Sequence, residues 1–221
     1  MSQHSKQRLA ALAGVVIVLA AAHPAWAQRG RGFRRQFGVP EAQLATLDEV
    51  QTELKMTDEQ KTRVAEINDE LGEKRRELWG TGFEGWSEIR PRMEGLNRDA
   101  SESVDKVLDP AQRQRLQEIA IQQNGPRALN DPEVVAELGL SDEQKAKLAA
   151  AGEENSQAFE KSFAESGRED WRQKAGELAD EADKRLLSVL TDEQKSKFKQ
   201  MEGQEFEVDL SQLFRGGRGG R

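Results

Sequence analysis

The sequence lacks cysteine and tyrosine altogether, and its only histidines are His4 and His23. Without its first 27 residues the chain would contain no histidine either. Such a chain cannot build the serine–histidine and cysteine–histidine nucleophilic systems or the common zinc sites, which need His or Cys. It also cannot form disulfide bonds, so its stability must come from packing. We predict that the protein is not an enzyme and has no catalytic residue, metal site or cofactor.

The sequence also lacks an apolar run long enough to be typical of a transmembrane helix, which needs roughly 20 residues. Its longest apolar run, Leu9–Ala22, follows Lys6 and Arg8 and precedes the small-residue sequence Ala25-Trp26-Ala27. This pattern is typical of a secretory signal peptide, so we predict that residues 1–27 are cleaved off after Ala27 and that the protein is exported, to the periplasm or outside the cell. Retention of this segment as a membrane anchor is the alternative.

Basic residues are outnumbered by acidic ones in the middle of the chain. All 40 acidic residues lie between Glu41 and Asp209, whereas nine of the 33 Lys and Arg lie outside this stretch. We interpret residues 28–45 as a disordered basic linker and residues 211–221 as a disordered Arg/Gly tail, because both are of low complexity. These ends either solubilise the chain and touch its acidic body or adhere to an anionic envelope surface. Nucleic acid is the least expected partner, because an exported protein seldom meets it.

Four helix starts share one pattern, in which an apolar residue precedes Thr, Ser or Asp and a glutamine follows three positions later. The pattern is that of a capping box: the Thr, Ser or Asp oxygen accepts the backbone N–H of the glutamine, whose side chain reaches back to the capping residue. Pro110 supports one of these starts, because it falls on the first helical position. The motif residues are Met56, Thr57 and Gln60; Leu108, Asp109 and Gln112; Leu140, Ser141 and Gln144; and Leu190, Thr191 and Gln194.

An internal duplication relates these four starts. The segment Glu49–Lys61 recurs as Glu133–Lys145 at an offset of 84 residues, and the caps Asp109 and Thr191 are 82 residues apart. A fixed period of this kind is typical of repeat architectures. We therefore predict two tandem helical units, residues 46–125 and residues 126–210.

Apolar residues recur every three or four positions through each unit, which is typical of amphipathic helices, and no strand pattern is present. Because 36% of the residues are hydrophobic and 33% charged, each helix can bury one stripe and little more. We predict an all-α fold of extended, coiled-coil-like helical hairpins with three helices in each unit. The clearest stripes are Val64, Ile67, Leu71 and Leu78; Ile89, Met93, Leu96, Ala100, Val104 and Val107; and Trp171, Ala175, Leu178, Ala182, Leu186 and Val189.

The segment Leu190-Thr191-Asp192-Glu193-Gln194 is a literal Leu-Thr-x-x-Gln motif, and its copies come in pairs about fifty residues apart. In this respect the sequence resembles the LTxxQ-motif family of periplasmic proteins, which includes the Spy/CpxP-like chaperones and stress adaptors. The resemblance implies an all-helical, cradle-shaped homodimer without catalytic residues. It also implies binding of unfolded envelope proteins without ATP, or restraint of an envelope-stress sensor kinase. This chain has two motif pairs where the family has one, and its body is acidic where the family's client-binding surface is basic, which favours basic clients.

Aromatic residues cluster where the first two helices of each unit should be joined. One interpretation is core packing at the hairpin turn. The other is an exposed apolar surface for clients, next to a loop that Gly80, Gly82 and Gly85 keep mobile. The residues concerned are Trp79, Phe83 and Trp86 in the first unit and Phe159, Phe163 and Trp171 in the second.

Two acidic runs, Glu153-Glu154 and Asp180-Glu181-Ala182-Asp183, suggest either a solvated helix face or a divalent-cation site. No calcium-loop pattern is present, which favours the solvated face. The sequence as a whole predicts an exported, non-enzymatic protein-binding protein, either chaperone-like or an envelope-stress adaptor. The alternative is a structural or sensor-regulating interaction with one dedicated envelope partner.

Overall fold

The computed structural model describes residues 38–80, 86–165 and 168–215. All regular secondary structure within these ranges is helical, without a β-strand, which confirms the predicted all-α class. Several predictions fall outside the described residues: the signal peptide with its cleavage site after Ala27, residues 28–37 of the basic linker, and residues 216–221 of the Arg/Gly tail.

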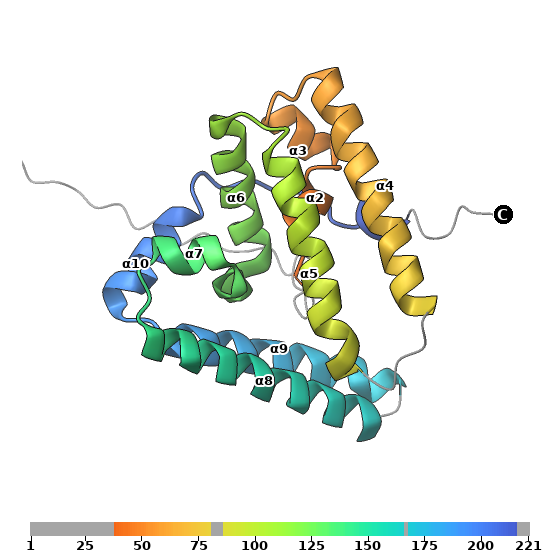
Figure 1. Cartoon of the computed structure of the whole chain (residues 1–221). Helices are drawn as coiled ribbons and strands as arrows, with labels where there is room; N and C mark the ends of the chain where they lie inside the picture. Colours follow the sequence, from red (N-terminus) through yellow and green to blue (C-terminus); the bar gives the residue numbers. More distant parts are fainter. Residues whose placement is uncertain (1–37, 81–85, 166–167, 216–221) are drawn as a thin grey trace, which may run out of the picture.

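Four long helices pair into two hairpins. Helix α4 (Asp58–Gly80) packs along α5 (Trp86–Asp105), and α8 (Asp142–Glu165) packs along α9 (Arg168–Ser188). Figure 1 shows the α8–α9 hairpin lying across the end of the molecule where α5 begins. Helices α4, α5 and α6 run at a steep angle to this hairpin. The shorter elements are α2 (Glu41–Leu44), α3 (Asp48–Glu53), α6 (Pro110–Asn124), the 3₁₀ helix η2 (Gly125–Asn130), α7 (Pro132–Glu137), α10 (Asp192–Met201) and α11 (Gln212–Arg215).

The predicted apolar stripes form the contacts within the hairpins. Every member of these stripes that the structure describes is buried or half-buried, apart from Trp171, whose side chain is not described. Buried positions are Val64, Ile67 and Leu71 in α4; Ile89, Ala100 and Val104 in α5; and Ala175, Ala182 and Leu186 in α9. Spacing by three and four places these residues on one side of each helix, so each helix buries a narrow seam.

The buried side chains form two clusters. The first runs from Val39 to Ala120 and the second from Ile121 to Phe198, so the division falls within α6. The interpretation as two tandem units, residues 46–125 and 126–210, remains a prediction. Several contacts cross that boundary, because partly buried residues between Phe206 and Leu213 pack against the first cluster.

The prediction that residues 28–45 are a disordered linker is wrong for residues 38–45. Ala42, Leu44 and Ala45 have no exposed surface. Val39 is tied to the end of α6: its N–H donates to Asn124 Oδ1 at 2.6 Å and its carbonyl accepts from Asn124 Nδ2 at 3.0 Å. The apolar residues after Gly38 therefore complete the first cluster. The prediction of disorder was based on the Arg/Gly sequence just before them.

The prediction that residues 211–221 are a disordered tail is likewise wrong for its first part. Ser211 donates its backbone N–H to Asp209 Oδ1 at 2.9 Å, α11 covers residues 212–215, and Leu213 packs against the first cluster. The apolar residues Leu210 and Leu213 are spaced as one helical turn requires, which brings both onto the same apolar surface.

The helices α3 and α7 were not predicted. Each is a six-residue helix that buries one valine, Val50 or Val134, and lies just before a capping-box motif. Each is followed by a residue with positive φ, Lys55 at 51° and Gly139 at 63°. This left-handed residue ends the short helix and turns the chain into the next capping box.

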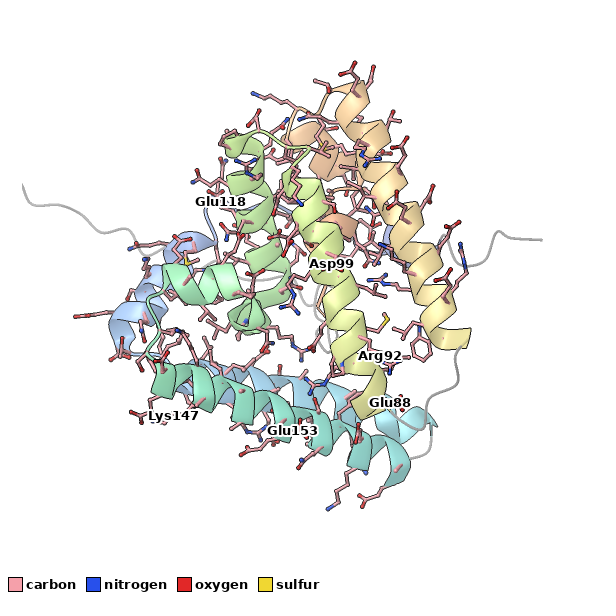
Figure 2. All side chains as sticks on the ribbon, viewed as in Figure 1. Glu88, Arg92, Asp99, Glu118, Lys147 and Glu153 are labelled. Atoms are coloured by element: carbon pink, nitrogen blue, oxygen red, sulfur yellow. The ribbon has the colours of Figure 1, made fainter. Side chains whose placement is uncertain are left out.

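Ion pairs connect the α8–α9 hairpin to the rest of the molecule. Arg127 of η2 approaches Asp183 of α9 at 3.7 Å, and both side chains are largely buried. Arg90 of α5 reaches Glu153 of α8 at 3.3 Å. In Figure 2, Glu153 is labelled on α8 below the start of α5, where Glu88 and Arg92 lie one turn apart.

Candidate functional site

The hydrogen bonds expected of a capping box are present at all four motifs. At the start of α6, the Asp109 carboxylate accepts the N–H of Gln112 at 2.9 Å, and Gln112 Oε1 accepts the N–H of Asp109 at 2.9 Å. The same exchange occurs at the starts of α4, α8 and α10. Each motif thus provides partners for backbone N–H groups that the helix itself leaves unpaired.

The glutamines of the first two motifs also bind each other. Gln60 Nε2 donates to Gln112 Oε1 at 2.7 Å, and Gln112 Nε2 donates to Gln60 Oε1 at 3.1 Å. Each Nε2 also donates to a backbone carbonyl, that of Val107 for Gln60 and that of Leu54 for Gln112, both at 3.0 Å. This amide pair joins the starts of α4 and α6.

A second amide pair joins the starts of α8 and α10. Gln144 Nε2 donates to Gln194 Oε1 at 2.6 Å and to the Val189 carbonyl at 3.0 Å, and Gln194 Nε2 donates to Gln144 Oε1 at 3.2 Å. In the first pair, every donor and acceptor of both side-chain amides is used. The amide pairs therefore link helix starts, and they have few free hydrogen-bond donors or acceptors with which to bind a ligand.

Sequence reasoning assigned each glutamine to its own cap and missed this pairing. A capping box works equally well with Glu or Gln at the third position, yet all four copies have Gln. Glutamate has no N–H with which to form a reciprocal pair. The uniform choice of Gln was therefore the available signal that each motif has a partner.

The aromatic residues predicted as client contacts differ in exposure. Trp79, near the end of α4, is 49% exposed, which is at odds with the core-packing interpretation for this residue. Phe159 of α8 is half-buried. Phe83 lies outside the described residues, as do the side chains of Trp86, Phe163 and Trp171.

Sequence reasoning also missed an acidic cavity, which forms where α2, α6 and α7 meet the end of α5. The cavity has a volume of about 350 Å³, and four carboxylates line it against two basic groups. No motif marks this cavity, because its residues come from four separate elements. The lining residues are Glu41, Glu102, Asp105, Lys106, Arg113, Gln117 and Glu133.

Glu41 has the most perturbed environment in the acidic cavity. Burial, followed by the negative charges of Asp131, Asp105 and Glu133, raises the pKa of Glu41 from 4.5 to about 8. Burial also raises the pKa of Asp105 and of Glu133. Among the described residues no basic side chain forms an ion pair with Glu41. Glu41 is thus mostly protonated at pH 7, and a cation entering the cavity would favour its ionised form.

This shift predicts that stability falls as the pH rises. Because the pKa of Glu41 is higher in the folded state, its contribution is fully present below about pH 4.5 and is lost by about pH 8. In the wild type we expect the unfolding free energy to decrease by on the order of 1–3 kcal/mol between pH 5 and pH 8. Glu41→Gln stays neutral at this position and should lack the decrease. Urea unfolding at pH 5.5, 7 and 8.5 measures the difference. The control Glu59→Gln, at an exposed position of α4, should follow the wild type, and parallel curves for all three proteins would refute the prediction.

The two acidic runs are engaged with neighbouring arginines. Glu153 contacts Arg90 and Asp183 contacts Arg127, while Glu154 lies 3.5 Å from Arg185. Within the described ranges, no group of three or more His, Cys, Asp or Glu residues is arranged to hold a metal ion. These contacts give Glu153, Glu154 and Asp183 a role in joining helices.

Charged side chains cover the outer faces of the helices, as Figure 2 shows along α4, α5 and α8. Across the part of the chain that the structure describes, no helix combines the length and the apolar character needed to cross a membrane. No model of a protein family matches the sequence, and neither a curated protein nor a solved structure matches it.

Proposed function

We propose that this protein is an exported, non-enzymatic binding protein of the cell envelope that holds unfolded polypeptides, with a preference for basic ones. Export is inferred from the signal-peptide pattern of residues 1–27. The chaperone-like function agrees with the resemblance to the LTxxQ-motif family and with the lack of Cys, Tyr and, after cleavage, His.

The observation that carries this proposal is the exposure of Trp79. Tryptophan has a large apolar surface and is enriched at protein-binding sites. Trp79 is nonetheless 49% exposed near the end of α4, next to the half-buried Leu78. An apolar side chain presented among exposed charges can contact many different clients weakly, and the surrounding charges keep the free protein soluble.

The preference for basic clients follows from the distribution of charge. Between Glu41 and Asp209 the chain has 40 acidic residues and 24 basic ones. A Lys or Arg side chain of a client would also meet the acidic cavity, which four carboxyl groups line and where a positive charge would favour the ionised form of Glu41. Complementary charge raises the rate of association and suppresses binding of acidic chains.

The proposal is tested by light scattering of denatured clients diluted into buffer with the mature chain, residues 28–221. We expect suppression of aggregation without ATP at near-stoichiometric ratios, stronger for a basic client than for an acidic one. Trp79→Ser should weaken the suppression at least twofold, because it removes apolar contact area.

The control is Glu77→Ser, which changes an exposed residue one half-turn earlier on α4 and should leave the suppression of the basic client nearly unchanged. Circular dichroism checks that both variants remain helical. Equal suppression by Trp79→Ser and the wild type would remove Trp79 from the binding surface, and no suppression of either client would refute the proposed function.

The alternative is an adaptor with one dedicated envelope partner. The acidic cavity favours it, because a small carboxylate-lined site suits one defined basic group better than many clients. A pulldown from envelope extract with the mature chain separates the two functions: a single stoichiometric partner supports the adaptor, and a broad set of proteins supports the chaperone.

A further inference from the structure

The segment after α10 returns to the first apolar cluster as an irregular strap, which we define as residues 203–213. Gly203 has φ 61° and turns the chain at the end of α10. Figure 1 shows this blue segment passing behind α6 and α5 toward α2 and α4. A Cβ at position 203 would overlap the carboxylate of Glu118, which is labelled on α6 in Figure 2. The positive φ would strain any side chain at position 203, and a Cβ would also displace the end of the Glu118 side chain, so glycine suits the first residue of the strap.

The first contacts of the strap are made through its backbone. Gln122 Nε2 donates to the carbonyl of Gln204 at 2.7 Å, and Gln122 Oε1 accepts the N–H of Phe206 at 2.9 Å. Arg115 Nη1 also donates to the Gln204 carbonyl at 2.9 Å. One side-chain amide thus holds the strap by a carbonyl and an N–H two residues apart. Such contacts do not depend on the side chains of the segment that is bound.

Arg115 is fixed in position for this role. Its guanidinium pairs with Glu53 of α3 and Glu118 of α6, both at 2.8 Å, and lies 5.8 Å from the centre of the Phe206 ring. The two carboxylates orient the arginine, and its face covers the aromatic ring.

Further along the strap, Glu49 of α3 makes the next contacts. One of its oxygens accepts the N–H of Asp209 at 3.2 Å, and the other accepts from Gln212 Nε2 at 3.3 Å. The strap therefore has polar contacts near both ends, at Gln122 and at Glu49, with its apolar residues between and beyond them.

The side chains of the strap alternate. Phe206, Val208 and Leu210 are half-buried against the first apolar cluster, whereas the residues between them are exposed. This period of two is that of an extended chain with one face on an apolar surface. The surface on α3 and α6 thus accepts an extended peptide by its backbone and by alternate apolar side chains.

The exposed residues of the strap do not match the charge of their surroundings. Glu205 and Glu207 are exposed carboxylates on a chain that already has 40 acidic and 24 basic residues between Glu41 and Asp209. Neither Glu205 nor Glu207 forms an ion pair with any residue of the described ranges. A peptide with the same apolar pattern but basic residues at the exposed positions would be attracted to this acidic chain.

We infer that the surface on α3 and α6 is a peptide-binding groove for extended, basic segments with apolar residues at alternate positions, and that the strap occupies this groove until such a segment displaces it. This inference rests on the proposed function and names the chemistry of the client segment. The strap keeps the apolar groove covered in the free protein, and its exposed Glu205 and Glu207 lack the attraction that basic residues would have to the acidic chain.

Fluorescence anisotropy of a labelled peptide tests the groove. The probe has the sequence of residues 203–213 with Glu205, Glu207 and Asp209 replaced by lysine. The double variant Phe206→Ser/Leu210→Ser of the mature chain weakens the strap and leaves the groove intact. We expect it to bind the probe at least tenfold more tightly than the wild type, and we expect the added substitution Gln122→Ala to reduce that binding at least fivefold.

A second variant opens the strap without changing its apolar contacts. Gly203→Ala should increase probe binding, whereas Gly139→Ala should bind as the wild type does. Gly139→Ala is the control, because it strains a residue with a similar positive φ at which a Cβ would meet no atom within 4 Å. Equal binding by all variants that remain helical would overturn the inference, as would tighter binding that Gln122→Ala leaves unchanged.

The oligomeric state tests whether the groove holds the strap of a second copy of the chain and not a client segment. If the wild type sediments as a dimer that dissociates in Phe206→Ser/Leu210→Ser, the strap is exchanged between two copies and the assignment to a client is overturned. The anisotropy experiment contains no client protein, so its failure is separate from a failure to suppress aggregation.

Discussion

Replacing Gln112 with leucine is expected to lower the free energy of unfolding by about 2–3 kcal/mol, which corresponds to roughly 5–10 °C in Tm. Gln112 is 9% exposed, and its side chain binds Gln60, the Leu54 carbonyl and the Asp109 N–H. Leucine has a similar volume but leaves these partly buried groups without their partner. The loss arises mainly from the unpaired groups, because leucine itself suits a buried position.

Two further substitutions make this prediction specific. Gln114→Leu changes an exposed glutamine on the same helix and should alter stability by less than about 0.5 kcal/mol. Gln194→Leu should fall between the two, because Gln194 is half-buried and its Nε2 donates to Gln144 alone among the described hydrogen bonds. Urea unfolding followed by circular dichroism measures all three, and equal effects of Gln112→Leu and Gln114→Leu would contradict a stabilising role for the amide pair.

Truncation of Leu44 is expected to have the largest effect on stability. Leu44 has no exposed surface in α2, and this helix packs against α4, α5 and α6. Leu44→Ala should lower the free energy of unfolding by about 2–5 kcal/mol, because it leaves a cavity where three helices meet.

The control for Leu44→Ala is Gln43→Ala, which changes the half-buried neighbour in the same short helix. Its expected effect is below about 1 kcal/mol, because no buried apolar group is lost. Thermal unfolding followed by circular dichroism compares the two. If Leu44→Ala unfolds at the wild-type temperature, the segment after Gly38 is not part of the core.

Local patterns predicted most of the fold. The capping boxes gave the starts of α4, α6, α8 and α10, because cap, glutamine and apolar residue are neighbours in sequence. The spacing of the apolar residues gave the buried seams for the same reason. Where an element depends on a distant surface, the sequence was less informative: Leu44 and Leu213 lie in short helices whose burial is decided by residues far along the chain.

The candidate sites were predicted less well. The acidic cavity combines side chains from four elements, so no spacing in the sequence predicts it. The contact of Gln122 with the strap spans more than 80 residues and uses the backbone of the strap, which leaves no motif. Only the pairing of the motif glutamines had a sequence signal, namely the use of Gln in all four copies where Glu would cap as well.

Binding of a permanently unfolded polypeptide to the mature chain tests the central claim most directly. Calorimetric titration with one lysine-rich and one glutamate-rich unfolded polypeptide of equal apolar content, without ATP, gives both affinity and preference. We predict saturable binding of the basic polypeptide that weakens with added salt, and much weaker binding of the acidic one. An absence of saturable heat with both polypeptides would contradict this prediction.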